Sequence, residues 1–378
     1  MNLAPLSPPL TILHIFSGDL WAGAEVMIFN LLAELHLDEQ VRSVALSLNE
    51  GVLTSKLRAV GVETHVIPEA QFSFPSILLR AARLLRLRKI DLIHSHRYKE
   101  NLLAFLLGKF LGVKAVIATI HGLPESPNIQ NARGNFLSLL DRLLLRNFFA
   151  HAVAVSHDMK MQLVESQRFS PVHVSVIHNG IRIEGCSLPD NGPEPLVSRH
   201  HTFHIGSVGR LVPVKDFALF LEIAAGITRE SQNVRFSILG DGPCKTDLEE
   251  KANRLGLNGH FSVIPATQDP MAYYTSLDIY LSTSLHEGVP MSVLEAMACG
   301  VPVIAAKVGG LSEIITDEVH GFLVEGRDPA GFVRRCFELL KDTDRRHIVR
   351  ESAFRRVTSE FSAVRMAREY SARYLNLL

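Results

Sequence analysis

The chain has 378 residues, a length that predicts two domains, each with its own hydrophobic core. Its 39 basic and 39 acidic residues give a formal net charge of zero, so composition does not favour nucleic acid as a partner. The four cysteines include no pair at the spacing of a metal or redox motif, which argues against a zinc knuckle or a disulfide framework and indicates reduced thiols in a cytoplasmic protein.

The chain begins with a short leader, MNLAPLSPPL, which lacks the basic start of a signal peptide and contains three prolines. Short β-branched runs then alternate with amphipathic stretches, as expected of βαβ units around a parallel sheet. The longest apolar region, residues 102–120, is interrupted by Lys109 and Lys114 and falls short of a transmembrane helix. The predicted strands of this half are residues 11–16, 41–48, 64–67, 92–94, 115–120, 152–155 and 174–177, and its clearest helices are 24–35 and 77–87.

A change of composition at residues 184–201, where glycine and proline cluster among polar residues, predicts a linker over residues 186–202. The alternation then resumes, with predicted strands at residues 204–208, 235–239, 261–264, 279–282, 301–305 and 321–324. We therefore predict two doubly wound α/β domains, over residues 1–185 and 203–362, followed by a helix over residues 363–378.

The loop between the first strand and the first helix has the sequence GDLWAGAE, residues 18–25. Gly23 and Ala24 stand where that helix begins, a position at which a phosphate or an acceptor would meet backbone N–H groups. Trp21, the single tryptophan, is either an aromatic platform beside this loop or a core residue.

Four histidines lie at or just beyond the ends of predicted strands: His14, His94, His96 and His121. Alternate residues of a strand share a face, so His94 and His96 lie on the same side, and with His121 they would be able to ligate a metal ion. No carboxylate-rich segment accompanies them, and paired core or cleft histidines are commoner, so the sequence favours a site without metal.

Two cations follow the first strand of the second domain: Arg210, in the sequence Gly-Arg-Leu, and Lys215. A forked guanidinium and a lysine point charge at this place would neutralise a diphosphate, whereas the alternative is a solvated loop with ordinary surface charges. Gly240 ends the next strand, where it allows either close backbone approach of a ligand or a plain tight turn.

The most informative segment is SLHEGVPMSVLEAMACGVPVIAAK, residues 284–307, in which seven residues separate Glu287 from Glu295. Ser292 and Glu295 have the spacing of a capping box, which predicts a helix N-terminus, and hence an anion site, near Ser292. Alternatively, Glu295 only caps its helix and Glu287 is a solvated loop residue.

This segment, with EAMACGVPV at residues 295–303, resembles the signature of the retaining glycosyltransferases of family 4. The histidine, Gly-Arg-Leu and Gly-Asp-Gly-Pro segments resemble other family motifs, in the same order along the chain. The resemblance implies a GT-B fold, in which two Rossmann-like domains face a cleft and the last helix crosses back to the first domain.

The resemblance also implies residue roles. Glu287 would contact the donor sugar, Glu295 the ribose hydroxyls, and Arg210 and Lys215 the diphosphate, while His121 would lie at the reaction centre. Gly23 and Ala24 would belong to the acceptor-side loop, and the remaining donor-binding positions would be Gly240, Gly288, Val289, Met291 and Ser292.

The implied activity is retaining transfer from a nucleotide-diphosphate sugar to a glycan, lipid-linked or polysaccharide-precursor acceptor, without a metal or another cofactor. A nucleotide-sugar epimerase and a non-enzymatic nucleotide-sugar sensor remain alternatives. The chain departs from the family pattern in three places: Ala22 and Asp216 replace glycines, and residues 265–267 replace a glycine turn.

Residues 80–89 combine arginines and a lysine with leucines on one amphipathic stretch. This pattern fits weak contact with the cytoplasmic membrane face, and equally a solvated helix over an ordinary core. We therefore expect a cytoplasmic protein, with peripheral membrane attachment as the alternative to a fully soluble one.

Overall fold

The computed structural model describes residues 8–122, 132–183, 188 and 202–378, with side chains from residue 139 onward in the helix that begins at Ala132. The chain forms two compact units, residues Met1–Arg182 with Ala363–Leu378 and residues Ile183–Ser362. Nearly all of the predicted linker, residues 186–202, lies outside the described residues. No helix of the described residues is long and apolar enough to cross a membrane.

The first unit contains a seven-stranded parallel sheet in the order β3-β2-β1-β4-β5-β6-β7. The order reverses between β1 and β4, and the crevice at such a switch point is where open parallel sheets bind ligands. The strands are β1 (Leu10–Phe16), β2 (Val41–Ser47), β3 (Glu63–Val66), β4 (Leu92–Ser95), β5 (Ala115–Ile120), β6 (His151–Ala154) and β7 (Val174–Val176).

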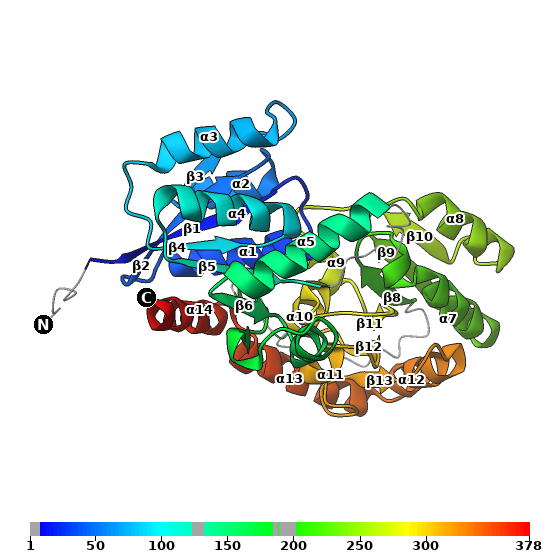
Figure 1. Cartoon of the computed structure of the whole chain (residues 1–378). Helices are drawn as coiled ribbons and strands as arrows, with labels where there is room; N and C mark the ends of the chain where they lie inside the picture. Colours follow the sequence, from blue (N-terminus) through cyan, green and yellow to red (C-terminus); the bar gives the residue numbers. More distant parts are fainter. Residues whose placement is uncertain (1–7, 123–131, 184–187, 189–201) are drawn as a thin grey trace, which may run out of the picture. The chain divides into compact units, whose positions relative to one another are not determined.

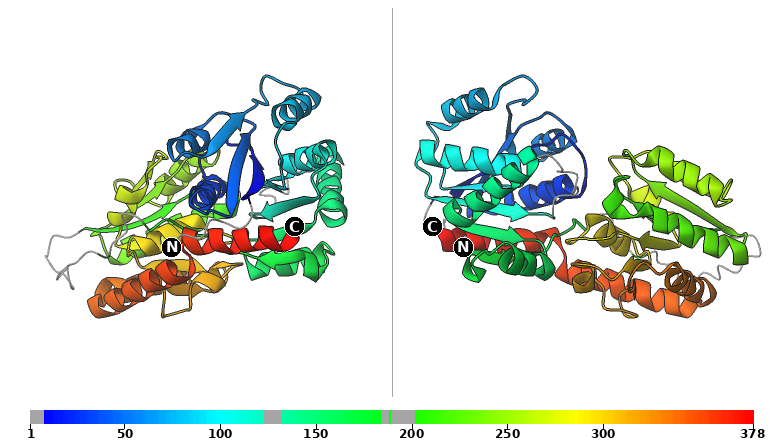
Figure 2. Two further views of the ribbon diagram at one scale, coloured as in Figure 1. Left: turned by 90° about the vertical axis from the view of Figure 1, so that its left-hand side faces the viewer. Right: turned by 45° about the vertical axis from the view of Figure 1, so that its right-hand side comes forward.

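Helices cover both faces of this sheet, as the continuously apolar strands require (Figure 1). They are α1 (Gly23–Leu35), α2 (Val52–Ala59), α3 (Phe74–Leu85), α4 (Tyr98–Leu111), α5 (Ala132–Phe148), the short α6 (His157–Met161) and the C-terminal α14 (Ala363–Leu377). Figure 2 shows α14, in red, within this unit, where it packs on α1. The prediction that the last helix returns to the first half is confirmed.

The second unit contains a six-stranded parallel sheet in the order β10-β9-β8-β11-β12-β13. Its strands are β8 (Phe203–Val208), β9 (Val234–Leu239), β10 (Phe261–Ile264), β11 (Ile279–Ser282), β12 (Val303–Ala306) and β13 (Phe322–Val324). Its helices are α7 (Phe217–Glu230), α8 (Lys245–Arg254), α9 (Met271–Thr275), α10 (Met291–Ala298), α11 (Leu311–Ile314), α12 (Pro329–Lys341) and α13 (Thr343–Glu360).

Each sheet has its own core of buried aliphatic and aromatic side chains. The second core includes Phe220, Phe236 and Phe332 from α7, β9 and α12, all fully buried. Burying one such side chain contributes about 1.5 to 3 kcal/mol to the free energy of folding. Each core therefore stabilises the sheet from whose strand ends the loops extend.

Candidate functional site

Lys215 and Glu287 form an ion pair in the second unit, although 72 positions separate them in the sequence. Lys215 ends the short turn Pro213–Lys215 beyond β8, and Glu287 follows β11, the neighbouring strand. Lys215 Nζ lies 2.6 Å from Glu287 Oε1, and Ser284 Oγ donates to the same oxygen at 2.6 Å. Burial acts to lower the pKa of Lys215, but the Glu287 carboxylate outweighs it and raises the pKa above its usual value.

The backbone around this pair is held by glycine and hydroxyl contacts. Gly309, with φ of +49°, passes so close to Glu287 that a Cβ at residue 309 would lie 2.1 Å from the Glu287 carbonyl oxygen. Gly310 N donates to that oxygen at 3.0 Å, and Thr283 Oγ1 donates to the Lys215 carbonyl at 3.0 Å. The turn after β12 therefore sets the position of Glu287, and only glycine fits there.

Gly240 packs directly on the loop that carries Arg210. A Cβ at residue 240 would lie 1.9 Å from the Gly209 carbonyl oxygen, so the loops after β8 and β9 touch through their backbones. Leu211 N donates to the Asp241 carbonyl at 2.8 Å, which joins the same loops a second time. This packing is sufficient to explain why residue 240 is a glycine. Contact between Gly240 and a donor stays a prediction. Arg210 itself is half-buried beside this junction.

Asp216, where the resemblance leads one to expect a glycine, adopts a left-handed conformation with φ of +44°, which glycine adopts readily. Aspartate tolerates this conformation better than most residues. Its carboxylate accepts two hydrogen bonds from the Arg327 guanidinium, one of them at 2.9 Å from Nη2. The Arg327 guanidinium thus holds Asp216 in this conformation, and Arg327, which precedes α12, is a supporting residue that no sequence motif indicated.

The helix expected near Ser292 begins at Met291, but the predicted capping box is wrong. Pro290 is the N-cap residue, and no side chain caps the helix, because Ser292 already lies in its first turn. The Glu295 carboxylate instead accepts a hydrogen bond from Tyr274 Oη at 2.7 Å. Burial raises the pKa of Glu295 to about 7, with the Tyr274 hydrogen bond acting against it.

The remaining predicted donor residues form the turn into α10. Val289 and Met291 are buried, with 3% and 5% of their surface exposed, and Ser292 is half-buried. Contact of these two residues with a ligand stays a prediction, and it would have to involve their backbone groups. With Gly288 they stand at the carboxyl end of β11, the same edge of the sheet as Arg210 and Lys215, and Glu295 lies one turn farther along α10.

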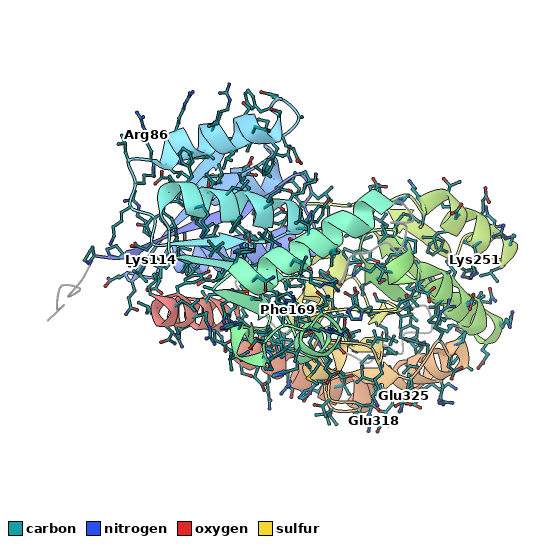
Figure 3. The ribbon with its side chains drawn as sticks, in the orientation of Figure 1. Arg86, Lys114, Phe169, Lys251, Glu318 and Glu325 are labelled. Atoms are coloured by element: carbon teal, nitrogen blue, oxygen red, sulfur yellow. The ribbon has the colours of Figure 1, made fainter. Side chains whose placement is uncertain are left out.

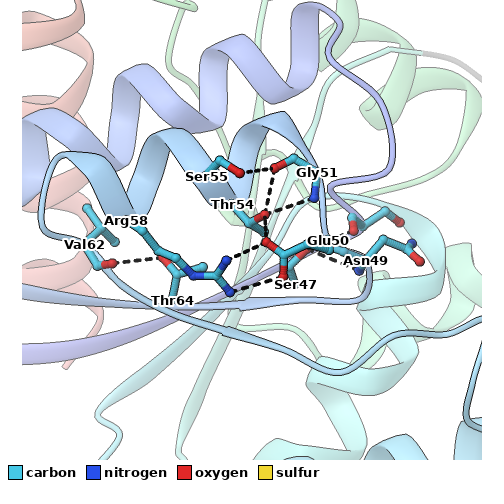
Figure 4. Close-up of polar contacts among 10 residues, drawn as sticks. Ser47, Asn49, Glu50, Gly51, Thr54, Ser55, Arg58, Val62 and Thr64 are labelled. Carbon is cyan, nitrogen blue, oxygen red and sulfur yellow. Dashed lines mark hydrogen bonds and ion pairs between the residues drawn. The ribbon is translucent and has the colours of Figure 1, made fainter.

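In the first unit, the loop after β1 is fixed by the loop after β2. Gly18 has φ of +73°, and a Cβ at Gly51 would lie 2.3 Å from the Gly18 carbonyl oxygen. Ser47 Oγ donates to the Ser17 carbonyl at 2.9 Å. Figure 4 shows how Thr54 ties Gly51 and Glu50 together at the start of α2.

Gly23 and Ala24 do open α1, as predicted, and Ala22 is the N-cap residue without a side-chain cap. Beside them the buried Glu25 pairs with Arg97, and the buried Glu100 accepts a hydrogen bond from Ser17. Burial raises the pKa of both carboxyls, although Arg97 and Ser17 act in the opposite direction. The sequence did not single out these carboxyls.

Trp21 is neither a fully buried core residue nor a freely exposed aromatic platform, the two interpretations that the sequence offered. Its ring is half-buried and meets Phe29 edge-on at 6.2 Å between centroids, while Lys56 Nζ lies 5.2 Å above it. The side chain is therefore held between α1 and α2 at the surface of the unit.

The four histidines named from the sequence do come together beneath the carboxyl ends of β1, β4 and β5. His14, His94 and His96 are buried, and His121 is half-buried. His94 Nδ1 lies 2.8 Å from Tyr374 Oη, and its Nε2 lies 2.8 Å from Thr119 Oγ1. Nitrogens of His14, His94 and His96 lie within 4.8 Å of one another, but hydroxyl groups already account for both nitrogens of His94.

Two family models match the chain and together span most of it. Residues 21–184 match the model described as Glycosyltransferase Family 4, and residues 193–356 match the one described as Glycosyl transferases group 1. The chain belongs to the family 4 glycosyltransferases.

Two glycosyltransferases resemble the chain over most of their length. The UDP-Gal:alpha-D-GlcNAc-diphosphoundecaprenol alpha-1,3-galactosyltransferase of Escherichia coli is 24% identical over 80% of this chain and 79% of its own. A D-inositol 3-phosphate glycosyltransferase of Salinispora tropica is 27% identical over 88% of this chain and 73% of its own.

Solved structures of glycosyltransferases have the same fold. Anabaena HepE, crystallised with UDP and glucose, superposes with a TM-score of 0.83 at 19% identity, covering 98% of this chain and 100% of HepE. Sucrose-phosphate synthase of Thermosynechococcus elongatus superposes with a TM-score of 0.75 at 16% identity, covering 97% of this chain and 99% of its own. The fold of this glycosyltransferase is therefore GT-B, as predicted.

Proposed function

We propose that this glycosyltransferase moves a sugar from a nucleotide-diphosphate sugar to a glycan, lipid-linked or polysaccharide-precursor acceptor, with retention of the anomeric configuration. The observation that carries the proposal is the Lys215–Glu287 pair, which lies at the same sheet edge as Arg210 and as the start of α10, the helix that contains Glu295. Solved structures of HepE with UDP-glucose, and the diphosphoundecaprenol acceptor in the name of the E. coli relative, support a UDP-sugar donor and a lipid-linked acceptor.

The charge and hydrogen-bonding groups of these side chains suit particular roles in binding the donor. Arg210 and Lys215 stabilise the charge that grows on the leaving diphosphate, because fixed cations are worth most where charge develops in the transition state. Glu287 accepts hydrogen bonds from the donor sugar, and Glu295 accepts them from the ribose. His121 stands at the reaction centre, and the loop of Gly23 and Ala24 faces the acceptor.

Retention is tested by NMR of the freshly formed product. With UDP-sugars as donors and a polyprenyl-diphosphate-linked sugar as acceptor, the new bond should have the anomeric configuration of the donor. A product of inverted configuration would contradict the proposal. Incubation with donor alone separates the alternatives, because an epimerase converts the donor without an acceptor and a sensor leaves it unchanged in both reactions.

We propose that transfer requires no divalent metal, since Arg210 and Lys215 supply permanent positive charge at the diphosphate position. Turnover should therefore be the same in excess EDTA as in magnesium or manganese. Loss of activity in EDTA that either metal restores would show that a cation shares this role.

We further propose that α3 contacts an anionic membrane surface. Arg80, Arg83 and Arg86 are exposed and have no acidic partner among the described residues, and Leu79, Leu84 and Leu87 beside them are 52%, 37% and 90% exposed. Figure 3 labels Arg86 here and Lys114, another exposed cation, beyond the end of α4. Arg88 forms an ion pair with Glu63, and Lys89 forms one with Asp91. The proposed membrane contact is therefore limited to the first part of the predicted basic stretch, residues 80–87.

Membrane contact is tested by co-sedimentation with phosphatidylglycerol vesicles. Each cation near such a surface contributes about 1 kcal/mol, so replacing Arg80, Arg83 and Arg86 by glutamine should weaken binding roughly 100-fold at low salt. Replacing the exposed Arg229, Arg254 and Arg355 of the second unit is the matched control and should change binding little. Equal binding by both triple variants would contradict the proposal.

A further inference from the structure

The buried Tyr274 gives its hydroxyl group to Glu295 alone. Tyr274 lies on α9, and none of its surface is exposed. Its Oη donates to Glu295 Oε2, on α10, at 2.7 Å, across 21 positions of the sequence. Among the residues that the structure describes, this hydroxyl has no other hydrogen-bond partner. One buried donor is therefore assigned to one oxygen of this carboxylate.

The other oxygen of the carboxylate, Glu295 Oε1, accepts no hydrogen bond from the described residues. It differs in its surroundings from Glu25 Oε2 and Glu100 Oε2, which are buried without a partner. Glu295 is half-buried, and Oε1 is not one of the buried unpaired atoms, so this oxygen reaches solvent. The carboxylate is thus held from within the protein through Oε2 and is open to a ligand through Oε1.

The helix that carries Tyr274 is itself fixed to the sheet. The adjacent Tyr273 donates from Oη to the Ser237 carbonyl of β9 at 2.9 Å. The ring of Tyr274 meets that of Tyr280, on β11, with 6.0 Å between centroids and 46° between the planes. Because α9 rests on two strands, Tyr274 approaches Glu295 from a fixed direction.

We propose that Tyr274 is a positioning residue, which holds Glu295 by Oε2 and leaves Oε1 to accept a hydrogen bond from a ribose hydroxyl of the donor. A glutamate side chain has several rotamers, and a hydrogen bond at one of its oxygens selects among them. The same bond favours the ionised carboxylate, which is an acceptor at both oxygens. The ribose contact rests on the proposed function, whereas the effect of Tyr274 on Glu295 does not.

Burial and the hydrogen bond act in opposite directions on the charge of Glu295. Burial raises the pKa of this carboxyl to about 7, and the hydrogen bond from Tyr274 lowers it. Tyr274 keeps its own proton, because burial raises the pKa of its hydroxyl well above the usual value. Without the tyrosine hydroxyl, Glu295 should therefore take up a proton at a higher pH than in the parent protein.

Titration of Glu295 by ¹³C NMR of the full chain tests this effect. The glutamate carboxyl groups are labelled, and the Glu295 signal is assigned by its loss in Glu295→Gln. In Tyr274→Phe, which keeps the buried ring, the midpoint should rise by about one pH unit, because hydrogen bonds to a charged group are stronger than those to a neutral one. Tyr273→Phe, on the same helix, is the matched control and should leave the midpoint unchanged. An unchanged midpoint in Tyr274→Phe would overturn the inference.

Other titratable or charged groups lie around Glu295 on the elements that pack against α10. They are Tyr274 on α9, Tyr280 on β11 and Arg350 on α13, with Cys299 at the end of α10 itself, whereas β12 has no titratable side chain. Burial raises the pKa of both tyrosines. The observed signal is the carboxyl carbon of Glu295, so a proton bound elsewhere is not mistaken for one bound there.

Calorimetric titration with UMP tests the ribose contact. At pH 9, where most of Glu295 is ionised in both proteins, Tyr274→Phe should still bind UMP roughly 10-fold more weakly than the parent, as expected for the loss of one oriented hydrogen bond. In a Glu295→Ala background the same change should have little effect, because Tyr274 acts through Glu295.

Equal weakening of UMP binding in both backgrounds would show that Tyr274 only supports the fold, and the inference would fail. A parent protein that shows the shift of the midpoint in Tyr274→Phe but binds no UMP would count against the proposed function and the ribose contact. The effect of Tyr274 on the charge of Glu295 would then still stand.

Discussion

Replacing Arg210 by alanine should weaken binding of UDP roughly 10- to 100-fold and lower turnover by at least as much. One charge-assisted hydrogen bond contributes about 1.5 to 3 kcal/mol, and the charge on the leaving diphosphate grows in the transition state. Lys215, which stays at the diphosphate position, compensates only in part for the lost cation, because Glu287 at 2.6 Å already neutralises part of its charge. Calorimetric titration with UDP and steady-state kinetics measure the two effects.

Glu295→Gln provides the contrast for this prediction. If Glu295 accepts hydrogen bonds from the ribose, its replacement should weaken UMP and UDP by similar factors, whereas Arg210→Ala should affect UDP more than UMP. Because burial raises the pKa of Glu295 to about 7, the parent should bind UMP better at pH 8 than Glu295→Gln does, with a smaller difference at pH 6. If the Arg210→Ala protein binds UDP as well as the parent does, Arg210 does not contact the diphosphate and is an ordinary surface charge.

The first unit should lose stability steeply as the pH falls below 6.5. Burial lowers the pKa of His14, His94, His96 and His121 in the folded protein. Below pH 6.5 the unfolded chain therefore binds more protons than the folded unit does, which lowers the free energy of unfolding. This stability is complete above pH 6.5 and is lost as the pH falls toward the folded values. At about 1.4 kcal/mol per pH unit for each group, the loss between pH 6 and pH 5 reaches up to ~5 kcal/mol.

Urea titration at several pH values measures this loss, with fluorescence of Trp21 as the signal, since the single tryptophan lies in the first unit. The groups that face the cluster from α14 and from the start of α4 are Tyr370, Tyr374 and Arg97, and none of them changes charge in this range. His14→Gln should reduce the dependence on pH, and His36→Gln, at an exposed position of the same unit, should not. Equal pH dependence in both variants would contradict the explanation.

The strands were predictable because their signals are local, and the GT-B fold was predictable because the motifs resemble those of a known family. A β-branched run such as residues 115–120 specifies its strand wherever it packs, and β5 has those bounds. Helix ends were less certain, as the failed capping box shows: Pro290 holds an extended conformation, and the helix therefore begins one residue before Ser292. The local sequence pattern predicted that a helix forms here. The extended backbone conformation of Pro290 determined that this residue is the N-cap.

The sequence by itself therefore determined the two parallel sheets, the family and the types of side chain at the strand ends. Only the tertiary structure decided which of those side chains meet. In the parallel register of β1, β4 and β5, His14 lies beside His94 and His94 beside Ile117, which brings a histidine row together from three separate segments. Lys215 and Glu287 meet because β8 and β11 are neighbours in the sheet. Such pairings depend on strand order and register, and no single segment of sequence contains either.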